Sequence, residues 1–144
     1  NARYYGFEVQ AAATLARFGG VRIAGDALAD YVHATIKGAG PAPRIPPLRA
    51  LGGLTAESRL LDGRVEVEHV TGQDRISAFE TPTEAYTVAN FELTVRPWGE
   101  ERPLSFALSA NNLFDATARR HASVLKNYAP LAGRDLRVTA RVEF

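Results

Sequence analysis

Residues 135–144 alternate apolar and polar side chains without interruption, and this period of two constrains the fold more than any other feature of the chain. One row is wholly apolar and consists of Leu136, Val138, Ala140, Val142 and Phe144. The other row is polar or charged and consists of Asp135, Arg137, Thr139, Arg141 and Glu143. Successive side chains of a strand point to opposite faces, whereas a helix repeats its apolar positions roughly every third or fourth residue. The segment is therefore predicted to be a β-strand.

Similar alternation recurs along most of the chain and predicts about seven strands and no confident helix. The predicted strands cover residues 5–15, 21–36, 48–60, 64–78, 86–96, 104–112 and 135–144. In the second of them the phase of the pattern slips near Gly25, which predicts a β-bulge there. We therefore expect an all-β fold in one continuous domain over residues 1–144, an antiparallel meander of about seven long strands.

Short and long connections alternate between the predicted strands. The short ones are residues 17–20, 61–63 and 97–103, and the long ones are residues 38–47, 72–85 and 112–133. The predicted strands are about ten to sixteen residues long, whereas strands of globular proteins usually have about five or six. Outer-membrane β-barrels combine long strands with short turns on one side of the membrane and long loops on the other. The pattern therefore favours part of a transmembrane β-barrel whose long loops lie outside the cell.

Composition argues against several other classes of protein. The chain has 17 Lys and Arg against 16 Asp and Glu, so no basic field is available for nucleic acid. It has no Cys, and no apolar run approaches the roughly 18 residues of a membrane helix. No nucleophile elbow or phosphate-binding loop occurs, so neither an enzyme nor a bound cofactor is expected. The chain begins at Asn1 and lacks Met, so we expect a processed chain or a fragment.

Several short segments resemble motifs of TonB-dependent outer-membrane receptors, and together they span nearly the whole chain. Residues 111–115 (NNLFD) resemble the element that ends the penultimate strand of these receptors, and residues 130–135 (PLAGRD) resemble the stretch before their last strand. Further similar segments are residues 5–8 (YGFE), 30–34 (DYVHA), 43–47 (PRIPP), 80–83 (ETPT) and 86–87 (YT). Outer-membrane barrels usually end in an aromatic residue, as at Phe144, and this similarity implies that the barrel-assembly machinery reads the last strand.

The resemblance implies a fragment of an active transporter in the bacterial outer membrane, with a metal ion or a metal chelate (siderophore, haem or zinc) as its cargo. A complete receptor of this family has a barrel of about 22 strands around a plug domain, so the chain would supply about the last third of the barrel. The plug and the segment that contacts TonB would lie outside it. The implied partners are TonB, outer-membrane lipid, lipopolysaccharide and an iron-, zinc- or haem-type ligand. A small outer-membrane barrel and a soluble ligand-binding β-barrel or sandwich stay open as alternatives.

Candidate ligand-binding residues lie in the long connections and near the outer ends of strands: His33, Arg44, Arg120, His121 and Lys126. Imidazole binds zinc, copper, nickel and iron, so His121 and His33 are candidate metal ligands. The pattern His-x-Ser-x-x-Lys, from His121 to Lys126, resembles receptors for zinc and haem. The cationic side chains, with Arg119 and Arg134, would form a basic rim that attracts anionic chelates. Contact with lipopolysaccharide or with water is the alternative for this rim.

Overall fold

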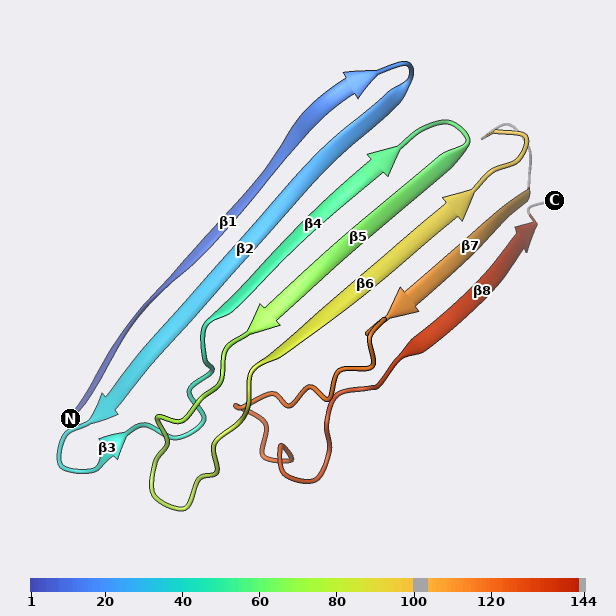
Figure 1. The fold of residues 1–144 in the computed structure, drawn as a ribbon. Helices are drawn as coiled ribbons and strands as arrows, with labels where there is room; N and C mark the ends of the chain where they lie inside the picture. The colour runs from blue at the N-terminus through green and yellow to red at the C-terminus, as the bar shows by residue number, and fades with distance from the viewer. Residues whose placement is uncertain (100–103, 143–144) are drawn as a thin grey trace.

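In a computed structural model, which describes residues 1–99 and 104–142, the chain forms one antiparallel sheet (Figure 1). The strands are β1 (Ala2–Phe18), β2 (Val21–Ile36), β3 (Gly40–Pro41), β4 (Arg49–Glu57), β5 (Leu61–Val70), β6 (Tyr86–Val95), β7 (Leu104–Asn111) and β8 (Asp135–Val142). The sheet order is β1-β2-β4-β5-β6-β7-β8, and the two-residue β3 pairs with β2. The predicted all-β meander of about seven long strands is thus confirmed, although Glu143 and Phe144 of the last predicted strand lie outside the described residues.

The connections of the sheet fall into two groups at opposite ends of the strands (Figure 1). The chain turns after β1, β4 and β6 at one end, which we call the short-turn end. Residues 37–48, 71–85 and 112–134 project from the other end, which we call the long-loop end. The alternation of short and long connections expected from the sequence is therefore present. In the described part of the chain, no helix is long and apolar enough to cross a membrane.

Several strand boundaries differ from the prediction, and local hydrogen bonds explain two of the differences. The strand expected over residues 64–78 ends at Val70, because the chain beyond it folds back on itself. Gln73 and Thr83 exchange backbone hydrogen bonds of 2.8 and 3.0 Å, which close residues 71–85 into a loop of their own. The turn expected at residues 61–63 lies earlier, since the hydroxyl of Ser58 accepts from the N–H of Leu61 at 3.1 Å and donates to its carbonyl at 2.8 Å.

The bulge is also in a different place from the one predicted. The register of β1 against β2 runs from Thr14↔Ala24 to Ala16↔Ile23, so the extra residue is Leu15 of β1. β2 itself alternates faces without interruption, so the phase slip near Gly25 is a change in the face that holds the apolar side chains: Ile23 lies on the same side as Leu54, whereas Leu28 and Val32 lie on the side of Asp26.

The register of the sheet separates charge from hydrocarbon. Side chains of cross-strand partners point to the same side of a sheet, so the pairings define two faces. We call the face that contains Asp26, Arg64 and Arg137 the polar face, and the face that contains Leu54, Val65 and Val138 the apolar face. The other charged residues of the polar face are Glu8, Arg17, Arg22, Asp30, Arg49, Glu57, Asp62, Glu66, Glu68, Glu92, Asp135 and Arg141. Among the described paired residues, the apolar face has a single charge, Arg3.

Nothing in the described residues covers the apolar face. Each long strand contacts only its neighbours in the sheet, and no second layer packs on it. Val138 is 79% exposed, Phe7 50% and Val65 49%. The one buried apolar cluster of the described residues, Val70 and Tyr86 with Ala118, lies instead on the polar face, where it joins the sheet to the loop 112–134. A sheet of this kind requires apolar surroundings for one face and water or polar groups for the other.

Close pairing of β1 with β2 depends on Gly6. A Cβ atom at this position would lie 2.2 Å from the carbonyl oxygen of Tyr31, which is backbone and cannot rotate away. We expect Gly6→Ala to lower the free energy of unfolding of the complete protein in detergent by about 1–3 kcal/mol, because the two strands must separate. Gly52→Ala is the control, since a Cβ at Gly52 meets nothing within 4 Å. Equal effects of the two substitutions would contradict the crowding argument.

Candidate functional site

The centre of the polar face carries a network of ion pairs across several strands. Arg64 donates to both oxygens of Asp26, at 2.6 and 3.1 Å, and to Glu66 at 2.8 Å, and Asn90 donates to Glu66 at 3.2 Å. Gly53 lies directly beneath the guanidinium, and a Cβ there would stand 2.4 Å from Arg64. The side chains of Arg64 and Asp26 are 30% and 31% exposed, so these ion pairs remain open to solvent. Their arrangement gives the polar face a continuous charged surface.

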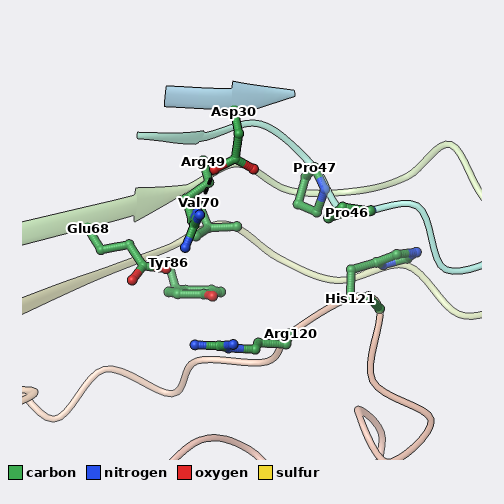
Figure 2. Close-up of a pocket in the computed structure, with 10 residues that line it drawn as sticks. Asp30, Pro46, Pro47, Arg49, Glu68, Val70, Tyr86, Arg120 and His121 are labelled. Atoms are coloured by element: carbon green, nitrogen blue, oxygen red, sulfur yellow. Dashed lines mark hydrogen bonds and ion pairs between the residues drawn. The ribbon is translucent and has the colours of Figure 1, made fainter. Parts of the chain in front are cut away.

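A cavity of about 200 Å³ lies where this surface meets the long loops (Figure 2). The sheet contributes Asp30, Arg49, Glu68 and Tyr86, while the loop 112–134 contributes Arg120 and His121. Arg49 donates to Asp30 at 2.7 Å, so its charge is compensated. Arg120 extends from the loop toward the ring of Tyr86 (Figure 2), and its side chain forms no ion pair within the described residues. The cavity thus combines an aromatic wall, a compensated ion pair, the carboxylate of Glu68 and a cation that is available to a ligand.

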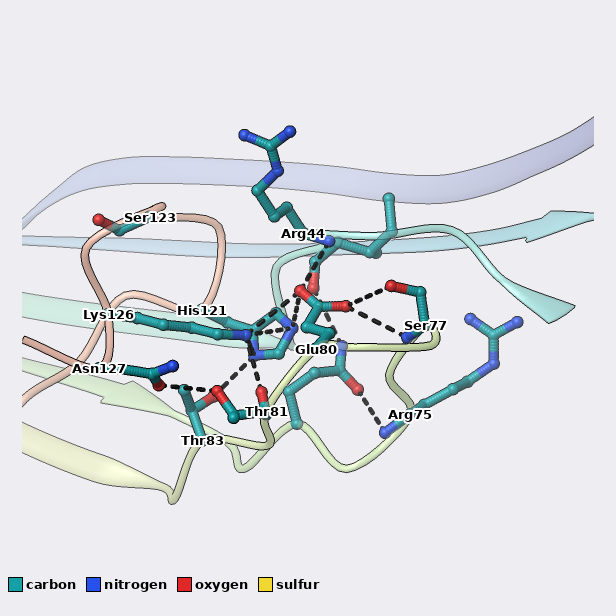
Figure 3. A network of polar contacts seen from close by, with 12 residues as sticks. Arg44, Arg75, Ser77, Glu80, Thr81, Thr83, His121, Ser123, Lys126 and Asn127 are labelled. Atoms are coloured by element: carbon teal, nitrogen blue, oxygen red, sulfur yellow. Dashed lines mark hydrogen bonds and ion pairs between the residues drawn. The ribbon is translucent and has the colours of Figure 1, made fainter. Parts of the chain in front are cut away.

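Glu80 joins all three long loops through one buried carboxylate (Figure 3). Its Oε2 accepts hydrogen bonds of 3.2 Å from both the N–H and the hydroxyl of Ser77. Its Oε1 accepts from the N–H of Arg44 at 2.9 Å, which ties in the loop 37–48. The same oxygen lies 3.2 Å from Nζ of Lys126 and 3.1 Å from Nε2 of His121, both in the loop 112–134. We call Glu80, His121 and Lys126 the loop cluster.

The contacts of His121 fix its tautomer. Its Nδ1 lies 2.9 Å from the hydroxyl of Thr83, and its Nε2 faces the carboxylate of Glu80. Because an ionised carboxylate can only accept, Nε2 carries the proton and Nδ1 accepts from Thr83. Both ring nitrogens are therefore engaged by the protein. Lys126 is held in the same way, since it also donates to the carbonyl of Thr81 at 2.7 Å.

The pKa values of Glu80 and His121 are both lowered, for different physical reasons. Burial, the largest effect on Glu80, raises its pKa, but hydrogen bonds from the backbones of Arg44 and Ser77 and from Lys126 outweigh it and bring the pKa to about 2. Burial lowers the pKa of His121 below 6.5, and the charge of Lys126 lowers it further, while Glu80 offsets part of the shift. The cluster at neutral pH is thus an ion pair with a neutral imidazole.

The motif of residues 111–115 ties together the two ends of the longest loop. Asn112, at φ 48°, accepts from the N–H of Ala116 at 2.8 Å and donates to the carbonyls of Ala116 and Ala132 at 2.9 and 3.2 Å. Asp115 accepts from the N–H of Arg134 at 2.8 Å. The segments 111–115 and 130–135, which resemble receptor motifs in the sequence, therefore meet in space at the base of the loop. The side chains of Asn112 and Asp115 thus hold the backbone at the two ends of this loop together.

The predicted site residues fall into separate places. Arg120 and His121 line the cavity, Lys126 belongs to the loop cluster, and Arg44 reaches that cluster through its backbone N–H. His33 lies on the apolar face of β2, stacked on Tyr5 at 4.6 Å between ring centres. The sheet therefore separates His33 from His121, and no group of three or more His, Cys, Asp or Glu able to hold a metal occurs in the described residues. A metal role for either histidine stays a prediction.

Reasoning from the sequence did not select Glu80, Arg49 or Tyr86 as site residues. In the sequence Glu80 belongs only to the segment ETPT, and its partners in the structure lie up to 46 residues away. The signal available in the sequence was an acidic residue in one long connection and a His-to-Lys pattern in another. Arg49 and Tyr86 begin β4 and β6, and their importance follows from the loop that folds over them.

Comparisons with known proteins support the architecture. No protein-family model matches the chain, and no curated protein matches it by sequence. Among solved structures it is similar to the copper transporter OprC, with a TM-score of 0.75 and 23% sequence identity. The similarity covers 99% of this chain and 24% of OprC, so the chain spans about a quarter of the length of that structure. At this identity the match shows the fold, a sheet like that in part of a barrel protein.

Removal of the Glu80 charge is expected to release the long loops. Glu80→Gln leaves Lys126 buried without its counter-ion, and a broken buried ion pair costs about 3–5 kcal/mol. We expect limited proteolysis of the complete protein to cut within residues 112–134 faster than in the unsubstituted protein. Glu84→Gln, an exposed carboxylate in the same loop, is the matched control. Unchanged cleavage in Glu80→Gln would show that the loop cluster does not hold the loops together.

Acidification is expected to open the same loops. The pKa of His121 is lowered in the folded chain, so an opened loop binds a proton that the closed one excludes, and closure weakens as pH falls below 6.5. The lowered pKa of Glu80 adds a second loss between 4.5 and about 2. Hydrogen exchange of residues 112–134 should rise between about pH 7.5 and pH 5.5 relative to His121→Gln, which has no titrating ring. The same pH dependence in both proteins would refute the role of His121.

Proposed function

We propose that this chain is a wall segment of an outer-membrane β-barrel transporter that takes up a metal ion or a metal chelate. The observation that carries the proposal is the separation of the two faces by the sheet register, with a single charge, Arg3, on the described apolar face. A charge at the bilayer midplane on the outer wall of a barrel costs about 2–4 kcal/mol, whereas lumen positions tolerate charge. The apolar face therefore fits hydrocarbon and the polar face fits a wet lumen.

The two ends of the sheet support one orientation in the membrane. The short-turn end matches the periplasmic side of such barrels, and the long-loop end matches the outside of the cell. In this orientation β8 runs toward the periplasm, and the barrel-assembly machinery recognises it as the last strand. The loop cluster and the cavity then lie at the outer mouth of the lumen. Lipid and lipopolysaccharide contact the outer wall.

The cargo is proposed from the cavity and from the fold. Arg120 provides a cation without a counter-ion in the described residues, and Tyr86 provides an aromatic surface beside it. This pair suits a metal chelate with acidic groups, such as a siderophore or haem, better than a bare cation. The structural similarity to a copper transporter supports a metal cargo in general.

The energy source and the rest of the barrel are proposed from the resemblance of the sequence to TonB-dependent receptors. In this proposal the complete protein has a plug domain and further strands, and TonB acts through the plug. Residues 1–144 then form the C-terminal portion of the barrel, whose edge strands β1 and β8 pair with other strands of the same wall. No catalytic step enters the proposal, in keeping with the lack of a catalytic motif in the sequence.

Two alternatives keep the same sheet. A small outer-membrane barrel needs closure between β1 and β8, and a soluble β-barrel or sandwich needs a layer over the apolar face. The strands β1 and β2, with 17 and 16 residues, favour a large membrane barrel whose strands extend beyond the bilayer. The location of the complete protein separates the soluble class from the other two.

The proposal is tested first by location. An antibody against residues 113–132 is used to follow the complete protein through cell fractionation. We expect a heat-modifiable band in the outer-membrane fraction, a strong loss of that band for Val138→Arg on the apolar face, and little change for Thr139→Arg on the polar face, because only the former places charge in hydrocarbon at a cost of about 2–4 kcal/mol. A band in the soluble fraction, or equal effects of the two substitutions, would refute the membrane wall.

Uptake is the second arm of the same test. Cells that lack the gene should accumulate less of the labelled metal or chelate under metal limitation, and the unsubstituted gene should restore uptake. Arg120→Gln should raise the concentration needed for half-maximal uptake about tenfold, the factor that corresponds to one charge-assisted hydrogen bond. Unimpaired uptake in cells without the gene, with the protein still in the outer membrane, would favour the passive barrel.

A further inference from the structure

The exception to the charge separation lies at one level of the sheet. Arg3 is opposite Thr35 on the apolar face, close to the long-loop end. Its guanidinium carbon lies 5.6 Å from the ring centre of Tyr5, and the ring of Tyr5 stacks on His33 at 4.6 Å. A polar and aromatic group on an otherwise apolar wall marks the level at which hydrocarbon gives way to lipid headgroups. We call Arg3, Tyr5, Tyr31, His33, Thr35 and Arg75 the interfacial belt.

Hydrogen bonds connect four members of the belt, Tyr31, His33, Thr35 and Arg75. The hydroxyl of Tyr31 lies 3.3 Å from Nδ1 of His33, and the hydroxyl of Thr35 lies 3.5 Å from its Nε2. Arg75, from the loop 71–85, donates to Thr35 at 2.6 Å and to the carbonyl of Ala34 at 2.8 Å. These bonds bring the second guanidinium of the belt onto β2 from a segment about 40 residues away. The belt therefore combines residues of β1 and β2 with a residue of the loop 71–85 that hydrogen bonds hold in place.

A small cavity opens beside the belt. The pairing of β2 with β4 ends at Asp30↔Arg49, and the pairing of β2 with β3 begins at Thr35↔Pro41. The intervening stretch of β2 borders a cavity of about 80 Å³ whose lining includes Tyr31, His33, Gln73 and Arg75. No Asp or Glu belongs to this lining, and neither Arg3 nor Arg75 forms an ion pair within residues 1–99 and 104–142.

We propose that the interfacial belt is a binding site for the phosphate headgroup of a membrane lipid, with the acyl chains of the lipid along the apolar face of β1 and β2. The inference rests on the proposed membrane location of that face. Guanidinium groups suit phosphate oxygens because they donate through parallel N–H groups and stay charged. Tyr31, His33 and Thr35 add polar groups at the same level, and the exposed Tyr5 and Phe7 beside them offer an apolar surface to the chains.

The two arginines favour an anionic partner, and the apolar side chains beside them favour a lipid. A cation on the outer wall is costly in hydrocarbon but nearly free at the interface, so Arg3 is stable at headgroup level. Two cations without carboxylate partners at that level attract an anionic surface. A soluble phosphate would have the guanidinium groups alone, whereas a lipid also covers apolar side chains that are half exposed in the isolated sheet, such as Phe7 at 50%.

The test uses the complete protein in detergent micelles and three probes: short-chain phosphatidic acid, diacylglycerol with the same chains, and inorganic phosphate. We expect binding of phosphatidic acid, detected by native mass spectrometry, and little binding of the other two. Arg3→Gln and Arg75→Gln should each weaken it about tenfold, the loss typical of one charge-assisted hydrogen bond. Arg17→Gln, an exposed arginine of the polar face at the short-turn end, should leave it unchanged.

Each outcome has a distinct meaning. Equal affinity of the unsubstituted protein and both belt variants, or competition by inorganic phosphate at the same concentration as phosphatidic acid, would overturn the lipid site. Arg75→Gln removes hydrogen bonds to β2, so the thermal stability of this variant is measured without lipid. If it unfolds, the result for Arg3→Gln decides, because the side chain of Arg3 has no hydrogen bond in the described residues.

A spin label separates failure of this inference from failure of the proposed function. The chain has no Cys, so Val138→Cys introduces a single labelling position within it, on the apolar face and far from the belt. A label that contacts lipid in reconstituted bilayers, together with no preference for phosphatidic acid, would overturn the lipid site alone. A label in water would overturn the membrane wall and the inference with it.

Discussion

The alternation of side chains along an extended backbone is the constraint on which this structure depends. In a single sheet of neighbouring strands, the register decides which residues share a face, and a shift of one residue would exchange the two faces of a strand. The register here brings Asp26, Arg64 and Glu66 together on one side and leaves Val65 and Val138 on the other. Backbone hydrogen bonds hold the sheet, while the medium on each side determines whether it is stable. The stability of this fold therefore depends on an apolar medium on one side of the sheet and a polar medium on the other.

A second constraint acts at the long-loop end, where the polypeptide leaves the sheet. Loops normally stay on the surface because their backbone groups need water. In this chain the side chain of Glu80 replaces part of that water, since it accepts backbone N–H groups from Arg44 and Ser77 in addition to the charges of its two side-chain partners. The loops gain a buried polar centre of their own, which places the cavity of Arg120 and Tyr86 against the polar face.

The parts of the fold that were predictable are those that depend on local period and turn chemistry. The alternation of residues 135–142 identified β8, and the order of short and long connections indicated the two ends of the sheet. The bulge at Leu15 is not predictable from the pattern of β2, because the phase change near Gly25 comes from apolar side chains on the polar face, such as Leu28, in a strand that has no bulge of its own. The loop cluster was out of reach, since Glu80 and Lys126 meet only after two loops have folded. The two candidate histidines lie on opposite sides of the sheet, His33 on the apolar face and His121 in a loop over the polar face. The residue type alone does not reveal this difference.

The sharing of one carboxylate by three loops also limits how this surface can diverge over evolution. A loop that folds alone can lengthen or change sequence without consequence for its neighbours, but here a displacement of Lys126 leaves Glu80 buried beside a weakened counter-ion and disturbs the segment of Arg44. Substitutions that leave the cluster intact are expected mainly at side chains that project into solvent, such as Phe79 and Tyr128, which are 109% and 85% exposed. The loops are therefore expected to diversify at their tips and to keep a common base.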